Sequence, residues 1–206
     1  MQDIIVEKPY QFIDPLRGNL FPTLIQTFRL CDRYLAKYEG VTSYEVRGAE
    51  ILQESMREHN GIVLAPNHCR YADPLAIGWL ARQAKTHVYA MASWHLFHQS
   101  RFQSFAMRAM GGFSVFREGL DRKSLETAIE ILVDAKRPLI VFPEGTVFRT
   151  NDLLQPMLDG VAFLARSAAR RRHKLDGGRV VIHPVAIKYL FHGDLHLSWF
   201  NGKWNF

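Results

Sequence analysis

The chain has 206 residues and a mass of 23.8 kDa, which is enough for one buried α/β core but a tight fit for two compact domains. Hydrophobic residues make up 48% of the chain and aromatic residues 12%, with no low-complexity tract or internal repeat, so a solenoid or a largely disordered protein is excluded. The formal net charge of +6 favours anionic partners, namely nucleic acid, phospholipid headgroups or phosphorylated small molecules.

The first predicted element is an amphipathic helix within residues 15–38. Apolar residues recur there at steps of three and four, with charged residues between them. Two fates are open to its apolar face: packing against the rest of the protein, or lying in a membrane interface. We therefore divide the chain into an N-terminal helical segment, residues 1–40, that could associate with a membrane, and a second domain, residues 41–206.

Strands and helices are predicted to alternate along the rest of the chain. The predicted strands are 44–47, 61–66, 87–92, 113–116, 138–142 and 179–187. The predicted helices are 50–58, 74–84, 94–110, 121–135 and 157–173. This alternation predicts an α/β fold, with a mixed, largely parallel central sheet flanked by helices on both faces and preceded by the N-terminal amphipathic helix.

The most informative segment, residues 67–74 (NHCRYADP), follows the apolar strand predicted at 61–66. The strand would deliver His68 to the edge of a sheet where α/β proteins place their chemistry, and Asp73 would open the next helix. A carboxylate can hold an imidazole in the tautomer that takes a proton from a hydroxyl. A structural interpretation is equally open, because Asp73 before Pro74 is a favourable helix start and His68 could simply bond a carbonyl.

Three further segments strengthen the catalytic interpretation. They are residues 111–117 (GGFSVFR), 141–146 (VFPEGT) and 181–187 (VIHPVAI). Together with His68 and Asp73, which are separated by four residues, these segments resemble the four sequence blocks of the glycerolipid acyltransferase family, which includes the 1-acylglycerol-3-phosphate acyltransferases. The resemblance covers roughly residues 60–188 in order and spacing, and four weak blocks in order are a strong match.

The resemblance implies a reaction and its partners. A fatty acyl group would pass from an acyl-CoA or acyl carrier protein thioester to the free hydroxyl of a lysophospholipid acceptor, 1-acylglycerol 3-phosphate, giving phosphatidate. His68 would be the general base and Asp73 would orient it. The acyl thioester would be a co-substrate, and no cofactor or metal is expected.

The resemblance also implies acceptor-binding residues. The guanidinium of Arg117 would bind the acceptor's phosphate, to which its two parallel donors are suited, although a surface salt bridge is the alternative for this residue. The third block would contribute Glu144, Gly145 and Thr146, with Glu144 either accepting a hydrogen bond from the acceptor's glycerol or orienting Arg117; the alternative is a plain strand-to-helix loop. Arg149 is included in this set.

Two departures from the family pattern bear on the acceptor more than on the reaction. The third block commonly continues with an arginine directly after the threonine, whereas this chain has Val147, with Arg149 two places later. The first block often carries a small hydroxyl residue between His68 and Asp73, whereas residues 69–72 here read CRYA. The rival acceptors are another lysolipid or a lipid-like amine.

Cysteine usage and the ends of the chain indicate the compartment. Cys31 and Cys69 lie in different contexts, so no disulfide framework is indicated and a reducing compartment is expected. Residues 1–8 carry Asp3 and Glu7 and do not resemble a signal peptide, and no apolar stretch is long enough to span a bilayer. We expect a cytoplasmic protein that associates peripherally with the inner face of a membrane and presents its charge to an anionic surface.

Other functions have weaker support. Cys69 beside His68 could be an acyl-accepting nucleophile, but neighbours in an extended segment point to opposite sides. His95 and His98 lack further metal-ligand spacing. The positive charge is not interleaved with aromatics as on a nucleic-acid module, so no nucleic-acid partner is expected. A catalytically silent lipid-binding or membrane-remodelling module remains the alternative outside enzymes. In it the amphipathic helix and the basic run at 166–174, which is otherwise a helix terminus, would matter more than His68.

Overall fold

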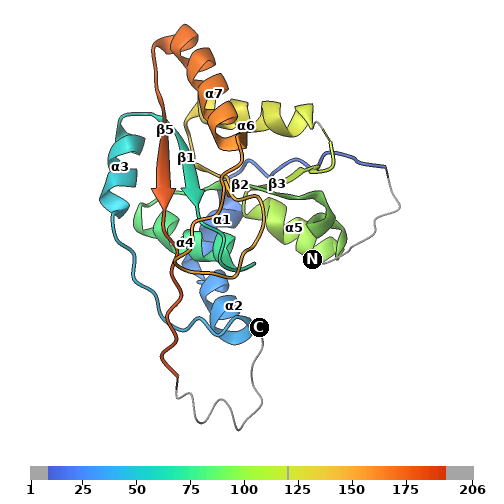
Figure 1. The fold of residues 1–206 in the computed structure, drawn as a ribbon, viewed down its shortest axis with the longest axis vertical. Coiled ribbons are helices and arrows are strands. Elements are labelled where there is room, and N and C mark those ends of the chain that lie inside the picture. Colours follow the sequence, from blue (N-terminus) through green and yellow to red (C-terminus); the bar gives the residue numbers. More distant parts are fainter. Residues whose placement is uncertain (1–8, 120, 194–206) are drawn as a thin grey trace.

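The computed structural model describes residues 9–119 and 121–193 (Figure 1). The helices are α1 Leu20–Thr27, α2 Leu30–Tyr38, α3 Ala49–Arg57, α4 Asp73–Gln83, α5 Arg101–Ala109, α6 Arg122–Asp134 and α7 Gly160–Asp176, with a 3-10 helix η1 at Trp94–His98. The strands are β1 Gly61–Pro66, β2 Tyr89–Ser93, β3 Gly112–Val115, β4 Leu139–Ile140 and β5 Val180–Val185. Residues 1–8, on which the expectation about a signal peptide rests, lie outside the described part.

The described strands form one sheet in the order β3-β2-β4-β1-β5, and every pairing within it is parallel. The interior strand β1 pairs on both sides, with Val63 opposite Leu139 of β4 and Ile182 of β5. Parallel strands need crossover connections, and the intervening helices supply them. The predicted α/β fold is confirmed.

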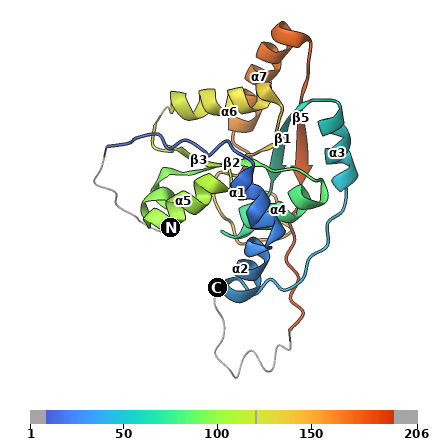
Figure 2. The same ribbon diagram turned by 180° about the vertical axis from the view of Figure 1, so that it is seen from behind.

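Helices cover both faces of the sheet because successive strand residues point to opposite sides. Val63 of β1 belongs to a core with α6 and α7, including Leu132 and Leu164. Its neighbours Ile62 and Leu64 belong to a second core with Leu52 of α3 and Ile77 of α4. Figures 1 and 2 show α6 and α5 on opposite sides of β2 and β3, so the layering extends to that edge of the sheet.

The strand predicted at 44–47 does not form. This segment has no strand pairing and packs instead on α4, where the Tyr44 ring stacks on Trp79 with centroids 4.2 Å apart. Val41 and Val46 pack against the small core of Leu35 and Trp79. The apolar residues that suggested a strand therefore dock on a helix rather than joining a ladder.

The helix predicted at 94–110 is interrupted. η1 ends at His98 and α5 begins at Arg101, because Ser100 adopts an extended conformation and its side chain accepts a hydrogen bond from Gln103 N. Serine at this position is a favourable helix N-cap. The long hydrophobic pattern thus spans two helices.

The predicted N-terminal helix is also divided, at Arg29, whose φ of 50° is left-handed. α2 packs on the domain through fully buried Leu35 and through Asp32, which accepts hydrogen bonds from Trp79 Nε1 (2.8 Å) and the Arg82 guanidinium. α1 is different, because Pro22 is its one buried residue and three of its large apolar side chains, those of Leu20, Phe21 and Leu24, are exposed. α2 therefore packs against the rest of the protein, which was one of the two predicted fates. The other, contact with a membrane interface, stays a prediction for α1.

No helix in the described residues is both long enough and apolar enough to cross a membrane.

The basic run at 166–174 is partly committed to structure. Arg172 is buried and donates to the carbonyls of Val133 and His59, and Arg171 pairs with Glu126. α7 ends at Asp176, and its C-cap residue, Gly177, takes the left-handed conformation that favours glycine. These contacts support the helix-terminus interpretation of the run.

Candidate active site

The four sequence blocks meet at one edge of the sheet because the strands that precede or contain them are parallel. His68 follows β1, Arg117 follows β3 and Glu144 follows β4, while the fourth block is β5 itself and the residues after it. The carboxyl edge of a parallel sheet is where α/β proteins bind ligands. Loops from distant parts of the chain therefore converge at this edge.

His68 and Asp73 form a hydrogen-bonded pair. Nδ1 of His68 lies 2.9 Å from Oδ2 of Asp73. The Asp73 side chain is fully buried, whereas 14% of the His68 side chain is exposed. With Nδ1 directed at the carboxylate, Nε2 is the nitrogen available to a hydroxyl, which is the arrangement that a general base requires.

Asp73 does not act as a helix cap. It is the first residue of α4, the cap position belongs to Ala72, and no side-chain hydrogen bond caps this helix. The carboxylate turns back instead, and its Oδ2 accepts a second hydrogen bond from Arg70 N at 2.9 Å. Of the two interpretations left open by the sequence, the geometry favours the orienting carboxylate.

The loop after β4 holds His68 from the opposite side. The His68 ring stacks on Phe142 with centroids 3.9 Å apart. The main chain of His68 is bonded at both groups, since its N–H donates to Oε2 of Glu144 (3.2 Å) and its carbonyl accepts from Phe148 N (3.0 Å). The first and third blocks thus form one packed unit.

Glu144 is buried, and its second oxygen, Oε1, has no hydrogen-bond partner within the described residues. Gly145 follows with a φ of +70°, which a glycine adopts without strain. A β-carbon at Gly145 would lie 3.8 Å from Nη2 of Arg117, so the guanidinium sits directly beside this turn. Arg117 itself is exposed.

Thr146 and Arg149 are both exposed, and Arg149 has a left-handed φ of 57°. They continue the same loop as Glu144 and Gly145 along the surface. The structure therefore brings Glu144 against His68 and Arg117 against Gly145, and it leaves Thr146 and Arg149 on the exposed part of the loop. The roles in acceptor binding that the sequence predicts for Arg117, Glu144, Gly145, Thr146 and Arg149 remain predictions.

Cys69 is unsuited to nucleophilic attack. Its side chain is buried and lies against Asn67 Nδ2 (3.0 Å) and the Ile187 carbonyl (3.3 Å). Burial, followed by the nearby carboxyl groups of Asp73 and Glu144, raises the pKa of the Cys69 thiol to about 11. The thiolate, which is the nucleophilic form, is therefore rare near neutral pH.

Three residues at this edge were missed by sequence reasoning as contributors to the site. Tyr189 donates from its hydroxyl to Oδ1 of Asp73 at 2.7 Å. Asn67 and Asn151 bond the main chain of the segment that carries Tyr189. The only available signal was position, because Asn67 precedes His68 and Tyr189 closely follows the fourth block.

The histidines of η1 do not form a metal centre. His95 Nε2 pairs with Glu118 at 3.1 Å, and His98 Nδ1 lies 3.3 Å from the Trp94 carbonyl. Among residues 9–119 and 121–193, no cluster of three or more histidine, cysteine or acidic side chains could hold a metal ion.

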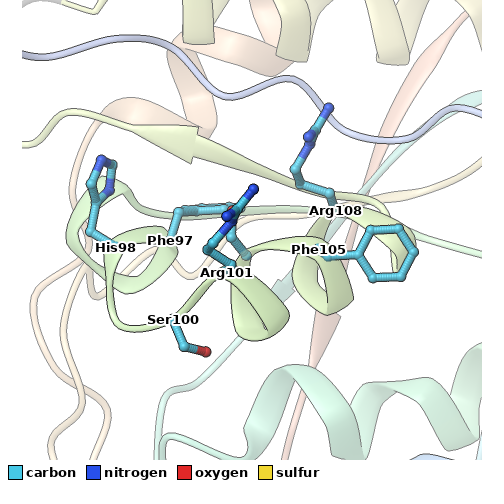
Figure 3. Close-up of a pocket in the computed structure, with 7 residues that line it drawn as sticks. Phe97, His98, Ser100, Arg101, Phe105 and Arg108 are labelled. Carbon is cyan, nitrogen blue, oxygen red and sulfur yellow. The ribbon is translucent and has the colours of Figure 1, made fainter.

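An open cavity of about 330 Å³ lies on η1 and α5 (Figure 3). It is lined by Phe97, His98, Ser100, Arg101, Ser104, Phe105 and Arg108. Arg101 and Arg108 project to the same side from successive parts of α5. None of these residues belongs to the His68–Asp73 pair, which we call the dyad, or to the loop after β4 that carries Glu144, which we call the Glu144 loop.

A parallel α/β sheet with a histidine–aspartate pair at its carboxyl edge is an arrangement that is suited to general-base activation of a hydroxyl. A family model described as Acyltransferase matches residues 43–188, well over half of the chain. The chain therefore belongs to the Acyltransferase family, and its chemistry is acyl transfer. No curated protein matched the chain.

Proposed function

We propose that this enzyme transfers a fatty acyl group from an acyl-CoA or acyl carrier protein thioester to the free hydroxyl of 1-acylglycerol 3-phosphate, giving phosphatidate for phospholipid biosynthesis. The observation that carries the proposal is the 2.9 Å contact between His68 Nδ1 and the fully buried carboxylate of Asp73. This pair leaves Nε2 as the base for the acceptor hydroxyl.

In the proposed reaction, Nε2 of His68 takes the proton of the hydroxyl as its oxygen attacks the thioester carbonyl. Asp73 stabilises the imidazolium that forms. The tetrahedral intermediate then collapses, the carbon–sulfur bond breaks, and the imidazolium returns its proton to the departing thiolate, which leaves as the thiol. No covalent acyl-enzyme is needed, in agreement with the raised pKa of the Cys69 thiol.

The acceptor would bind between Arg117 and the Glu144 loop. The guanidinium beside Gly145 can donate two parallel hydrogen bonds to phosphate oxygens. The buried Oε1 of Glu144 has no partner among the described residues, and a glycerol hydroxyl would provide the donor that such a buried oxygen requires. Thr146 and Arg149 would complete the phosphate contacts.

Val147 favours a second candidate acceptor. Where the family pattern commonly has an arginine, this exposed loop has an apolar side chain, which reduces the positive charge offered to a phosphate. A lysolipid with another headgroup, or a lipid-like amine, would demand less charge. Comparison of acceptors distinguishes the two candidates.

A peripheral position at an anionic membrane is part of the proposal, because both acceptor and product are lipids. Five exposed apolar side chains from α1 and α5 form what we call the α1–α5 patch: Leu20, Phe21, Leu24, Phe102 and Phe105. The rings of Phe21 and Phe105 meet edge to face with centroids 5.3 Å apart, so the patch is continuous between the two helices. Arg101 on α5 is exposed next to it.

Thiol release from acyl-CoA in the presence of an acceptor tests the function. We expect turnover with 1-acylglycerol 3-phosphate to exceed turnover with lysophosphatidylcholine or a long-chain amine. His68→Ala should lower kcat by about 10²–10⁴-fold, the usual contribution of a general base, with unchanged thermal unfolding. His173→Ala is the matched control, because this histidine is exposed on α7.

Two outcomes would contradict the proposal. Near-normal turnover by His68→Ala would remove the mechanism. Binding of the native enzyme to phospholipid vesicles without thiol release for any acceptor would favour the silent lipid-binding module instead.

A further inference from the structure

The Asp73 carboxylate is bonded at both oxygens. Oδ2 accepts from His68 Nδ1 and Arg70 N, both at 2.9 Å, whereas Oδ1 accepts from the Tyr189 hydroxyl at 2.7 Å. Tyr189 lies 116 residues after Asp73 and reaches it from the segment that follows β5. The carboxylate is therefore held between its own loop and a distant part of the chain.

Residues 186–189, which we call the strap, are fixed by two asparagine side chains. Asn67 bonds both main-chain groups of Ile187, accepting from its N–H at 2.6 Å and donating to its carbonyl at 3.0 Å. Asn151 does the same for Tyr189, accepting from its N–H at 2.9 Å and donating to its carbonyl at 2.8 Å. Each amide replaces the pair of bonds that a neighbouring strand would make.

These two anchors connect the strap to both halves of the site. Asn67 precedes His68, and Asn151 lies in the segment that continues from the Glu144 loop. Lys188 adds a 2.9 Å ion pair with Asp152. The position of the Tyr189 hydroxyl therefore depends on the same loops that carry the base and the proposed acceptor contacts.

The aromatic ring of Tyr189 is held as well. The Arg70 guanidinium carbon lies 5.0 Å from the ring centroid, a cation–π distance. Arg70 is anchored in turn by Glu39 at the end of α2, donating to its carbonyl at 3.0 Å and to its carboxylate at 3.3 Å. With its main chain and ring both fixed, the phenol has little freedom except to donate to Asp73.

We propose that Tyr189 is a positioning residue that fixes the carboxylate of Asp73, and through it the imidazole of His68, for acyl transfer; the inference rests on the proposed function of the dyad. By bonding Oδ1, Tyr189 leaves Oδ2 directed at His68 and prevents the carboxylate from rotating. It also takes up part of the negative charge, which would otherwise act more strongly on the imidazole. Tyr189 need not touch either substrate.

The titratable and charged groups around Asp73 allow this role. His68, Cys69 and Arg70 lie on its own loop, Tyr189 on the strap, and Glu144 on the loop after β4, where it bonds His68 N. Burial, followed by the hydrogen bond to Asp73, raises the pKa of the Tyr189 phenol well above its ordinary value, so the phenol keeps its proton. The pKa of Cys69 is raised to about 11, so this thiol adds no charge near neutral pH.

Tyr189→Phe removes the hydroxyl and keeps the ring. We expect kcat to fall about 10- to 100-fold, as for loss of one hydrogen bond to a charged group, with KM values for both substrates nearly unchanged. The carboxylate charge would then act more strongly on the imidazole and would favour its protonated form, which cannot act as a base. The acidic limb of the profile of kcat against pH should therefore move to higher pH. A residue with a merely structural role would leave that limb in place.

Tyr10→Phe is the matched control, because the Tyr10 hydroxyl also donates to a carboxylate, that of Asp121. The control should leave the acidic limb unchanged. Asn151→Ala releases the main chain of Tyr189 and should shift the limb in the same direction as Tyr189→Phe. An unshifted limb in Tyr189→Phe, or equal shifts in Tyr189→Phe and Tyr10→Phe, would overturn the inference.

A spectroscopic measurement separates this inference from the proposed function. In protein with ¹⁵N-labelled histidine, the ring resonances of His68, identified by their loss in His68→Gln, should move in Tyr189→Phe and stay in place in Tyr10→Phe. Unchanged resonances in Tyr189→Phe would reject the positioning role. Absence of turnover in the native enzyme would reject the proposed function, and the resonances would still decide the contact between Tyr189 and the dyad.

Discussion

At the scale of single residues, the adjacent side chains of His68 and Cys69 have surroundings that separate their chemistry. His68 is partly exposed, stacks on Phe142 and bonds a carboxylate. Cys69 is buried against Asn67 and the Ile187 carbonyl. The extended loop thus directs the base outward and the thiol into the structure, which favours direct transfer over an acyl-thioester intermediate.

We expect Cys69→Ala to keep kcat within a few-fold of the native value, because the thiol has no part in the transfer. The pKa of Cys69, and that of Cys31, is raised to about 11, chiefly by burial. Below that value the thiolate fraction falls about tenfold for each pH unit, so alkylation by iodoacetamide at pH 8 should be slow in the folded enzyme and fast after denaturation. Mass spectrometry measures both rates.

Loss of activity in Cys69→Ala with retention in Cys31→Ala would contradict this assignment. Rapid alkylation of folded protein at Cys69 would contradict it too.

How far the sequence predicted the site depended on distance along the chain. His68 and Asp73 are five residues apart, so a strand followed by a helix start was enough to bring them together. Arg117 and Glu144 entered the predicted site through the family resemblance, and the structure places both after strands of one parallel sheet, at the same edge as His68. Tyr189 could not be predicted, because its contact with Asp73 requires the path of the strap, which two asparagine side chains determine.

At the scale of elements, buried strands and amphipathic helices were predicted well and their interruptions were not. β1 agrees with its predicted bounds because an apolar run between polar residues has few alternatives. The break at Arg29 requires a left-handed residue within a continuous apolar pattern. The strand predicted at 44–47 was wrong because Tyr44 stacks on Trp79 of α4. Apolar residues that pack on a helix in this way can give the same sequence pattern as a strand.

The turn at Gly145 allows a test at this scale. Its φ is +70°, and an added β-carbon would lie 2.5 Å from Leu158 Cδ1. Gly145→Ala should therefore reduce the free energy of unfolding by about 1–2 kcal/mol, the cost of a left-handed conformation for a residue with a β-carbon. Guanidinium denaturation measures this change.

Gly78→Ala is the matched control. Gly78 lies inside α4 with nothing within 4 Å of its added β-carbon, so alanine should stabilise the helix by about 0.8–1 kcal/mol. Equal effects of the two substitutions would show that the Gly145 turn is not conformationally restricted.

At the scale of the whole molecule, the site and the basic end of α7 lie at opposite edges of the sheet. Figure 1 shows the C-terminal end of α7 at the far side of the sheet from the arrowheads of β1 and β5, which mark the edge with the dyad. A membrane bound through the end of α7 would therefore be remote from His68. Arg171 and Arg172 are also engaged by Glu126 and by main-chain carbonyls. The α1–α5 patch is the better candidate for a lipid contact.

The α1–α5 patch predicts which substitutions weaken membrane binding. Phe102 is 79% exposed, and burying a phenylalanine in an apolar medium contributes about 1.5–3 kcal/mol. Phe102→Ser should therefore lower the partition coefficient for phosphatidylglycerol-containing vesicles by about tenfold or more. Added salt should weaken binding further, because it screens the attraction between Arg101 and the anionic lipid. Vesicle flotation measures this coefficient.

Leu175→Ser provides the comparison, because Leu175 is 68% exposed on α7 and lies outside the patch. If the patch meets the bilayer, this substitution leaves binding unchanged while Phe102→Ser weakens it. A similar loss in both variants would mean that binding follows total exposed apolar area rather than one face. A loss in Leu175→Ser alone would place the membrane at the end of α7 and would separate it from the carboxyl edge that carries the dyad.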